Sequence, residues 1–512
     1  MAIRIDPTAT AHRVAPELHG QFIEFLGECI DGGIWVGRDS TIPNTDGIRQ
    51  GVLDALRELA PPVLRWPGGC YADTYHWRDG IGPASDRAVT FNENFGTYET
   101  DDHAFGTDEY LRLCEWIGAR PWINVNMMSG TVAEANAWME YCNRAQPTAL
   151  SQERAANGHL APYGVELWGI GNEPWGGGGT ATARSYLDAY RTFATAMPRF
   201  TTGVLEPSTM YPIASGPDGN KPQERVEWTR DFFRGLGEYR VPPIAGYDMH
   251  FYNWNLVEGE TPIDFDEAGW DRVINGCLEL EEVILEQRRL MDEGIAALPV
   301  PESDFFSPPV SVDLILGEWG NWHRDSFVAR PALYQQVTMR DAITTALTLD
   351  ILHRHGDAVT MACNAQTVNV LNALLLTEGE HTIRTPNFDV FMMYKAHQGA
   401  TALRAEARDA DSGAHVFTSR SGDTVTVNLI NPHMTRDVDV ELEFEASVTV
   451  MAMEVLTSDV PTRHNTASEP DAVRSRAVAV DGRSDTTHRV ELPAGSVTVV
   501  RVHLDGGHSL RG

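Results

Sequence analysis

Short apolar runs alternate with longer segments of helical period from about residue 17 to residue 398. The apolar runs predict strands buried in a sheet, at 20–25, 62–67, 121–126, 165–173, 245–252, 312–319, within 358–376 and, more weakly, near 200–214. The longer segments predict helices, most clearly at 47–59, 107–118 and 332–354. Strands that alternate with helices are typical of a parallel sheet, and eight of them favour an α/β fold of the (β/α)8 TIM-barrel type.

An open, doubly wound sheet would show the same alternation of strands and helices. Such a sheet usually carries a Gly-rich phosphate-binding turn after its first strand. The sequence after the strand predicted at 20–25 contains no such turn. The closed barrel is therefore the simpler prediction.

The pattern changes after residue 400, where apolar and polar residues alternate with a period of two. The segments with this period, at 414–420, 424–431, 438–445, 448–456 and 488–504, predict an antiparallel β-sandwich of roughly a hundred residues. The first residues, MAIRIDP, are predicted to add a strand to it. We therefore expect a barrel domain at 17–398 and a sandwich domain at 399–512 that includes a strand from 1–16.

Composition and charge narrow the classes of partner. The formal net charge is −32 at pH 7 and no run of Lys or Arg interrupts it, so nucleic acid is not expected as a partner. The sequence shows no apolar core of signal-peptide length at its start and no apolar stretch long enough to cross a bilayer, which predicts a cytoplasmic protein with no membrane partner. Six scattered cysteines without a close CxxC pair fit reduced thiols better than disulfides or a zinc site.

Two glutamates end predicted strands at the edge where a barrel carries its functional residues. Glu173 ends the strand in WGIGNEPWG and Glu318 ends the strand in LILGEW. Burial at such a place raises the pKa of one acid, while a neighbouring cation or donor keeps a second acid ionised. This division suits glycosidic cleavage with retention, in which one acid protonates the leaving oxygen and the other attacks the anomeric carbon from about 5 Å away. Most of the 72 acidic residues are surface charges, so position singles out these two.

Aromatic residues are dense around the same strand ends. Flat rings stack on the apolar faces of sugars, while their polar edges form hydrogen bonds. Some of these rings are expected to belong to the core, Trp168 among them, whereas Trp322 is expected to contact substrate. The set that favours a carbohydrate substrate comprises Trp66, Tyr71, Tyr75, Trp77, Trp168, Trp175, Tyr252, Trp254, Trp319 and Trp322.

A series of motifs resembles the α-L-arabinofuranosidases of glycoside hydrolase family 51. The segments occur in the order of that family and span essentially the whole predicted barrel. A lone NEP is a weak signal, since several barrel glycosidases share it, whereas the whole series is specific. The matching segments are GQFIEFLGECIDGGIWVG, LRWPGGCYADTYHWRDGIGP, FGTDEYLRLCEWIGARPWINVN, WGIGNEPWG, HFYNW, LGEWGNW, AQTVNVLNALLLTEGE and TPNFDVFMMYKAHQG.

The resemblance implies roles for individual residues. Glu173 matches the general acid/base of the family and Glu318 its nucleophile. Asn172 is expected to form a hydrogen bond with the 2-hydroxyl of the sugar. Glu24 matches a carboxylate that binds furanose hydroxyls, and Cys70 matches a pocket residue that contacts the same sugar.

Five further residues match supporting positions of the family. Tyr252 matches a tyrosine that orients the nucleophile, with His250 beside it, and Trp322 matches an aromatic wall of the pocket. Gln366 matches another ligand of sugar hydroxyls. Arg65 resembles the arginine that keeps the nucleophile ionised, a role that its permanent charge suits. Structural roles stay open for three of them: an ion-pair partner for Arg65, a buried, hydrogen-bonded histidine for His250 and a loop-fixing amide for Gln366.

Other positions depart from the family pattern. Pro174 follows the predicted acid/base, and a glycine run at 176–179 replaces a more varied loop. The segment 91–106, which should cover the leaving-group side of the pocket, matches poorly, and 253–310 is uninformative. The sequence thus predicts the sugar pocket but not the leaving group.

The resemblance implies an exo-acting, retaining hydrolase that removes terminal non-reducing α-L-arabinofuranosyl residues from arabino-oligosaccharides by double displacement. It needs no metal and no organic cofactor, and the family suggests a homo-oligomer such as a hexamer. One alternative is another retaining barrel glycosidase, a β-xylosidase or an endoglucanase, although Glu24, Cys70 and Gln366 argue against it. A second alternative is a non-catalytic carbohydrate-binding protein, which would not need both acids.

Overall fold

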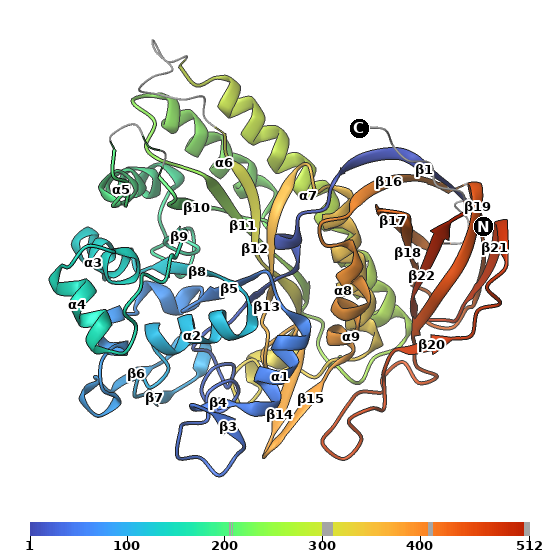
Figure 1. Cartoon of the computed structure of the whole chain (residues 1–512), viewed down its shortest axis with the longest axis horizontal. Helices are drawn as coiled ribbons and strands as arrows, with labels where there is room; N and C mark the ends of the chain where they lie inside the picture. Colours follow the sequence, from blue (N-terminus) through green and yellow to red (C-terminus); the bar gives the residue numbers. More distant parts are fainter. Residues whose placement is uncertain (204–205, 207, 300–310, 408–412, 506–512) are drawn as a thin grey trace.

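Eight parallel strands close into a barrel in the computed structural model, which describes residues 1–203, 206, 208–299, 311–407 and 413–505 (Figure 1). Around the barrel the order is β10-β11-β12-β13-β2-β5-β8-β9. The predicted (β/α)8 fold is therefore confirmed. The strands are β2 (Gly20–Phe22), β5 (Val63–Trp66), β8 (Arg120–Val125), β9 (Leu167–Ile170), β10 (Tyr211–Asp218), β11 (Gly246–Asn255), β12 (Asp313–His323) and β13 (Val359–Ala365).

Several barrel strands differ from their predicted bounds: β2 ends at Phe22 rather than at 25, and β12 runs on to His323, so Glu318 lies within this strand and not at its end. The strand predicted at 165–173 ends at Ile170, because Gly171 has a φ of 80° and turns the chain out of the sheet. The weak segment near 200–214 contains only the start of β10, which runs on to Asp218. Residues 204–205 and 207 of that segment lie outside the described residues.

Helices surround the barrel between its strands. The helix predicted at 107–118 is α2, whose N-terminus is held by Glu109, which accepts a hydrogen bond from the Gly106 N–H at 2.9 Å. The stretch 253–310, which gave no prediction, contains the 30-residue helix α7. The helices are α1 (Gln50–Leu59), α2 (Thr107–Ile117), α3 (Val132–Asn143), α4 (Ala149–Ala156), α5 (Ala183–Ala196), α6 (Pro222–Gly237), α7 (Glu267–Ala296), α8 (Met339–Arg354) and α9 (Pro386–Tyr394).

Three short hairpins extend from the barrel. They are β3 (Asn44–Thr45) with β4 (Ile48–Arg49), β6 (Thr90–Asn92) with β7 (Glu99–Asp101), and β14 (Leu375–Glu378) with β15 (His381–Arg384). The β6–β7 hairpin falls in the segment 91–106 that matched the family poorly.

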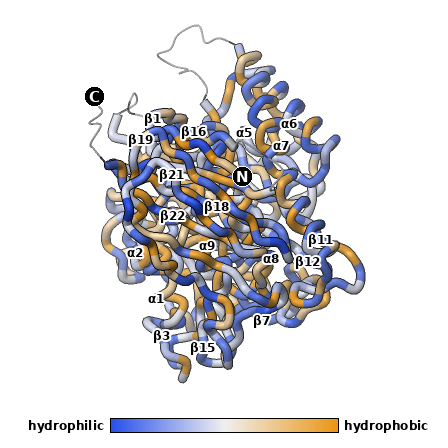
Figure 2. Tube along the Cα trace, turned by 90° about the vertical axis from the view of Figure 1, so that its right-hand side faces the viewer, coloured by the Kyte–Doolittle hydropathy of each residue, from blue (hydrophilic) through white to orange (hydrophobic). Residues whose placement is uncertain are grey.

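The C-terminal segments form one mostly antiparallel sheet that curls around its own apolar core. Its path is β1-β16-β17-β18-β22-β19-β20, with β21 beside β19, and a parallel pairing of β1 with β19 joins the first strand to the far side of the sheet. Figure 2 faces this sheet and shows hydrophilic and hydrophobic positions alternating along its strands. The strands are β1 (Ala2–Arg13), β16 (Thr401–Ala407), β17 (His415–Ser421), β18 (Thr424–Asn431), β19 (Val438–Leu456), β20 (Arg476–Val478), β21 (Ser484–Leu492) and β22 (Ser496–Leu504).

The N-terminal strand thus joins the sheet of the C-terminal segments, and Figure 1 shows β1 as a blue ribbon beside the red strands. The domain bounds 17–398 and 399–512 stay a prediction. Among the described residues, none of the helices combines the length and the apolarity that crossing a bilayer requires.

Three buried histidines lie where the barrel helices meet the C-terminal sheet. His19 and His353 approach each other through their Nε2 atoms at 2.8 Å, and the ring of His397 lies 5.2 Å from that of His353. His397 forms hydrogen bonds with Ser419 of β17 at 2.7 Å and with Asn428 of β18 at 2.8 Å. Burial is the main cause that lowers the pKa of His19 to about 3 and that of His397 to about 4, and it lowers the pKa of His353 as well. The cluster is therefore held neutral.

Candidate active site

The predicted site residues come together at the carboxyl ends of the barrel strands, where TIM barrels carry their chemistry. Six of the eight strands supply them, from within the strand or from the loop that follows it. Glu24 follows β2, Arg65 lies in β5 with Cys70 just after it, and Asn172 and Glu173 follow β9; His250 and Tyr252 lie in β11, Glu318 and Trp322 in β12, and Gln366 directly after β13.

Glu318 lies between two hydrogen-bond donors. Arg65, whose side chain is fully buried, donates from Nη1 to Oε1 of Glu318 at 2.6 Å, and the Tyr252 hydroxyl donates to Oε2 at 2.7 Å. Burial is the largest single influence and favours the neutral acid, but the charges of His250 and Arg65 together with the tyrosine outweigh it. The pKa of Glu318 is therefore lowered, and the carboxylate is ionised and aimed for attack.

Glu173 has the opposite electrostatic environment. Burial raises its pKa, and this effect exceeds the opposing hydrogen bond from His250, whose Nδ1 lies 2.8 Å from Oε1. The Cys70 thiol lies 3.7 Å from Oε2. The residue has a φ of 39°, a left-handed conformation that costs a non-glycine residue roughly 1–2 kcal/mol. A protonated Glu173 beside an ionised Glu318 forms the acid-and-carboxylate pair that retaining glycosidases use.

The two carboxyl groups are close together. Oxygens of Glu173 and Glu318 and a ring nitrogen of His250 all lie within 4.8 Å of one another. This close approach fits the spacing of about 5 Å of a retaining pair. The same three atoms are also the one group of possible metal ligands found among the described residues. Each of the three side chains is already bound to another protein group, and Arg65 supplies a positive charge there.

Glu24 and Gln366 meet on the other side of the site. Gln366 donates from Nε2 to Oε2 of Glu24 at 2.9 Å. The other oxygen of Glu24 accepts the backbone N–H groups of Gly69 and Tyr71, each at 3.0 Å, and the side-chain amide of Asn94 at 3.2 Å. Burial raises the pKa of Glu24 to about 7. Asn94 lies between β6 and β7, in the segment expected to cover the leaving-group side, and it contacts Glu24 although sequence reasoning did not single out this residue.

Asp248 is a second residue that sequence reasoning missed. Its Oδ2 lies 3.2 Å from Nε2 of His250 and 3.9 Å from Nη2 of Arg65, and its Oδ1 accepts the backbone N–H of Gly317 at 2.7 Å. Burial lowers the pKa of His250, but the charges of Glu318 and Asp248 outweigh it and raise that pKa to about 10. His250 is therefore a cation that links Asp248 to Glu173. The signal was in the sequence, because Asp248, His250 and Tyr252 alternate along β11 and point to the same face.

A cavity of about 740 Å³ opens from this site to solvent. Five of the ten aromatic residues singled out from the sequence line it, whereas the remaining rings are at most 2% exposed and belong to the core. The lining rings are Tyr71, Trp175, Tyr252, Trp254 and Trp322, and the core rings are Trp66, Tyr75, Trp77, Trp168 and Trp319. Phe91 and Phe95 of the hairpin segment and Phe327, after β12, add three phenylalanine rings to the lining.

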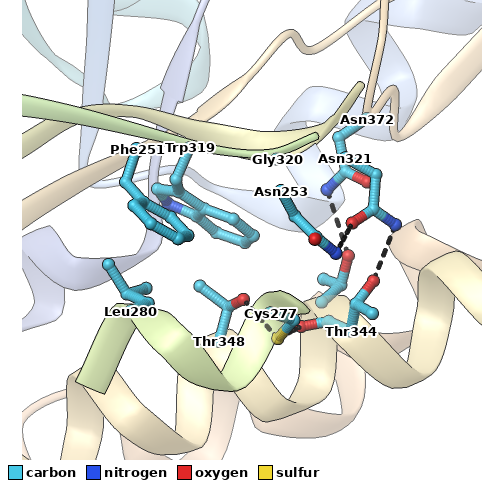
Figure 3. A pocket seen from close by; sticks show the side chains of 11 residues that line it. Phe251, Asn253, Cys277, Leu280, Trp319, Gly320, Asn321, Thr344, Thr348 and Asn372 are labelled. Carbon is cyan, nitrogen blue, oxygen red and sulfur yellow. Dashed lines mark hydrogen bonds between the residues drawn. The ribbon is translucent and has the colours of Figure 1, made fainter. Parts of the chain in front are cut away.

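The strands that carry His250 and Glu318 are fixed from behind by α7 and α8. Figure 3 shows a small internal cavity of about 10 Å³ between them, with Phe251 and Trp319 pointing toward the helices. Asn253 donates to Asn321 at 2.9 Å, and Asn321 donates to Thr344 of α8 at 2.8 Å (Figure 3). Hydrogen bonds of this kind hold the backbone on both sides of the catalytic face in place.

Comparison with known proteins decides the family. Residues 55–268 match the model of the α-L-arabinofuranosidase 1 domain, and residues 317–496 match that of the α-L-arabinofuranosidase C-terminal domain. The chain is 33% identical to an intracellular exo-α-L-arabinofuranosidase of Bacteroides ovatus, over 96% of this chain and 93% of that protein. It is also 31% identical to the family 51 arabinofuranosidase of Xanthomonas axonopodis pv. citri, whose crystal structure superimposes with a TM-score of 0.86 and covers 98% of this chain and 99% of that one. The chain belongs to glycoside hydrolase family 51.

A second family 51-like structure is the α-L-arabinofuranosidase of Thermotoga maritima in complex with arabinose. It is 27% identical to this chain, with a TM-score of 0.82 and coverage of 98% of this chain and 100% of that one. Family 51 enzymes are retaining glycosidases, in agreement with the carboxylate spacing.

The glycine run that departs from the family pattern has a structural reason in this family 51 chain. A Cβ at position 178 would lie 1.8 Å from the carbonyl oxygen of Asn172, so the loop packs directly on the backbone beside Glu173. The N–H groups of Gly176 and Gly178 both donate to the carbonyl of Glu173, at 2.8 and 3.1 Å. Only glycine permits this close approach, which supports the left-handed conformation of Glu173.

Proposed function

We propose that this chain is an exo-acting α-L-arabinofuranosidase that removes terminal non-reducing α-L-arabinofuranosyl residues from arabino-oligosaccharides by double displacement. The observation that carries the proposal is the pair Glu173 and Glu318, with oxygens within 4.8 Å and with pKa values shifted in opposite directions. Family membership supports the substrate class.

In the first half of the reaction, Glu318 attacks the anomeric carbon and forms a covalent glycosyl-enzyme. Glu173 gives its proton to the leaving oxygen as the glycosidic bond breaks. Arg65 and Tyr252 keep Glu318 ionised, and each of them binds one of its two oxygens. The carboxylate lone pair that attacks the anomeric carbon is therefore held in a fixed orientation.

In the second half, Glu173 acts as a base. It takes a proton from a water molecule, which attacks the anomeric carbon, releases arabinose and frees Glu318. The positively charged His250 at 2.8 Å stabilises the anionic Glu173 that exists between the two halves. The reaction needs no metal and no organic cofactor, which stays a prediction.

The sugar contacts follow from the same arrangement. We assign Glu24 and Gln366 to the furanose hydroxyls, and Asn172 to the 2-hydroxyl. Arg65 donates to Oδ1 of Asn172 at 2.7 Å, so the Asn172 amide nitrogen, which also donates to Sγ of Cys70 at 3.8 Å, is the group turned toward a ligand. Cys70 completes this wall, since burial raises the pKa of its thiol and keeps it neutral. Trp322 provides the aromatic side of the pocket.

We further propose a cytoplasmic location and a homo-oligomer such as a hexamer. The similarity to a Bacteroides ovatus enzyme named as intracellular supports the location. Short arabino-oligosaccharides taken into the cell are the substrates that such a location favours.

The test is release of 4-nitrophenol from the α-L-arabinofuranoside, measured beside the β-D-xylopyranoside and the β-D-galactofuranoside. The wild type is compared with Glu173→Ala and Glu318→Ala. We expect a strong preference for the arabinofuranoside and a loss of about 10³-fold in kcat for either variant, for Glu318→Ala because no glycosyl-enzyme forms and for Glu173→Ala because the glycosyl-enzyme is no longer hydrolysed with base assistance. Azide should restore turnover of Glu173→Ala with formation of the glycosyl azide of retained configuration.

Two outcomes would overturn the proposal. If the xylopyranoside is the better substrate, the retaining chemistry stands but the substrate class is wrong. If the wild type hydrolyses none of the glycosides, the chain is a carbohydrate-binding protein.

A further inference from the structure

The open part of the cavity lies on the leaving-group side of the catalytic pair. Glu173, which protonates the leaving oxygen in the proposed mechanism, lines the cavity, whereas Glu318 does not. Glu24 and Gln366, assigned to the sugar, also lie outside the lining, whereas Cys70 and Trp322, likewise assigned to the sugar, belong to it, so the cavity begins at the sugar pocket and extends past Glu173. The space beyond Glu173 is therefore where the group attached to the arabinose must lie.

The charged side chains around this space are mainly negative. Three carboxylates besides Glu173 line it: Asp79, Glu93 and Asp218. No Lys or Arg occurs among the described residues that line the cavity, although the chain contains 40 of them. Three histidines line the cavity, and each already has a partner: His250 is engaged by Asp248 and Glu173, His76 by Glu134 at 2.9 Å and His103 by the carbonyl of Ala88 at 2.9 Å. An anionic group in this space would therefore face carboxylates with no free cation to pair with.

Asp218 stands out among these three carboxylates because its charge acts on Glu173. It is the last residue of β10 and pairs with His250 of β11, and its charge contributes to the raised pKa of Glu173. Its Oδ1 accepts the N–H of Asn220 at 2.9 Å, and Asn220 in turn donates to the carbonyl of Tyr252 at 2.6 Å. The position of this carboxylate is thus fixed. Lys221 follows three residues later and its charge acts on Asp218, but it is exposed and outside the lining.

Aromatic rings line the same space as these carboxylates. Trp175 is held beside the end of β10 by a hydrogen bond from Nε1 to the carbonyl of Gly216 at 3.2 Å. Trp254 and Phe327 lie with their rings nearly parallel at 6.1 Å, and they are 39% and 44% exposed. Such rings bind neutral sugar or aryl groups by stacking, without any charge.

We propose that Asp218 makes this enzyme select neutral leaving groups and reject anionic ones, such as glycans that carry a uronic acid next to the arabinose. This inference rests on the proposed function and names the substrate class within it. Repulsion by one fixed carboxylate at the edge of a low-dielectric cavity is expected to lower kcat/KM by about tenfold, and added salt should weaken it.

The experiment compares two aryl α-L-arabinofuranosides, the 4-carboxamidophenyl and the 4-carboxyphenyl glycoside, which differ in charge at the far end of the ring. The ratio of their kcat/KM values is measured for the wild type, Asp218→Asn and Glu227→Gln. Glu227 is exposed on α6 and outside the cavity lining, so its variant removes one charge elsewhere. We expect the wild type to favour the carboxamide, Asp218→Asn to reduce the ratio by about tenfold, and Glu227→Gln to leave it unchanged.

Different results would overturn the proposed function and the role of Asp218 in selecting leaving groups. Absence of turnover of the carboxamide by the wild type overturns the proposed function and the inference together. Turnover of the carboxamide with a ratio that Asp218→Asn does not change overturns the inference alone. An equal change of the ratio in Glu227→Gln also overturns it, because net charge rather than Asp218 would then be responsible. A smaller ratio at high salt in the wild type, but not in Asp218→Asn, supports it.

Discussion

The carboxylate of Asp248 occupies the space that a side chain at position 317 would need. A Cβ on Gly317 would lie 2.1 Å from Oδ1 and 2.4 Å from Oδ2 of Asp248, and the Gly317 N–H donates to Oδ1 at 2.7 Å. Gly317 directly precedes Glu318, so this contact fixes the backbone of the nucleophile. The same carboxylate holds His250, and it thus connects both halves of the catalytic pair.

Gly317→Ala should therefore lower both stability and activity. The added methyl group forces Asp248 out of place between two buried strands, which costs about 1–3 kcal/mol of unfolding free energy. In an Asp248→Ala background the space is free, and the same substitution should cost much less. A double-mutant cycle on the free energy of unfolding, with kcat measured for each variant, checks this coupling. Additive effects would show that the two residues do not compete for one space.

Tyr252→Phe should move the acid limb of the pH–rate profile. Glu318 must be ionised to attack, and its lowered pKa depends in part on the Tyr252 hydroxyl. Without this donor the pKa rises, so kcat/KM falls at a pH about one unit higher than in the wild type, as expected for a hydrogen bond to a charged group. The basic limb, set by loss of the Glu173 proton, should move little. Tyr98→Phe is a suitable control, since Tyr98 is 59% exposed; an unmoved acid limb in Tyr252→Phe contradicts the assignment.

Asn94→Ala should weaken substrate binding more than turnover. The amide of Asn94 donates to Glu24 at 3.2 Å and joins the hairpin to the residue assigned to the furanose hydroxyls. Loss of one such bond is worth about 1 kcal/mol, or roughly a fivefold rise in KM, while kcat stays within about twofold. Thr100→Ala, in an exposed position of β7, provides the comparison. A fall in kcat alone would place Asn94 in the chemical step instead.

The histidine cluster should make the protein lose stability in acid. The pKa values of His19 and His397 are lowered to about 3 and about 4, far below the unfolded value of 6.5. Between pH 6.5 and these lowered pKa values, the unfolded chain therefore binds more protons than the folded chain. The free energy of unfolding keeps its full value above pH 6.5 and falls as the pH drops toward 4. Each histidine contributes up to about 1.4 kcal/mol per pH unit. His19→Gln should reduce this slope in denaturant titrations at several pH values, and the exposed His381→Gln should not. Equal slopes in all three proteins would exclude the cluster as the cause.

Strand-end carboxylates were the part of the site that the sequence predicted on physical grounds. Glu173 and Glu318 each follow a strong apolar run, and a barrel brings such ends to one face. Asn172, Cys70 and Gln366 have no signal of that kind, because their neighbours along the chain do not determine what they contact. They were found only through resemblance to the family, and their roles stay predictions.

Long-range packing explains what sequence reasoning did not find. Asp248 interrupts an apolar strand, and its counterpart at position 317 is a glycine whose meaning appears only when the two strands are paired. The β6–β7 hairpin has few apolar residues, and its contact with Glu24 depends on how the loop folds over the barrel. The start of β10 was misplaced because the weak segment before it carries little periodicity.

The position of β1 has a consequence for how the protein is made. This strand contains residues 2–13, yet its neighbours β16 and β19 belong to the last part of the chain. During synthesis β1 leaves the ribosome well before its partners and must wait, with its edge unpaired, until some four hundred more residues have followed. A barrel cut off before residue 399 would keep that edge exposed to other chains, which predicts aggregation rather than a smaller active enzyme.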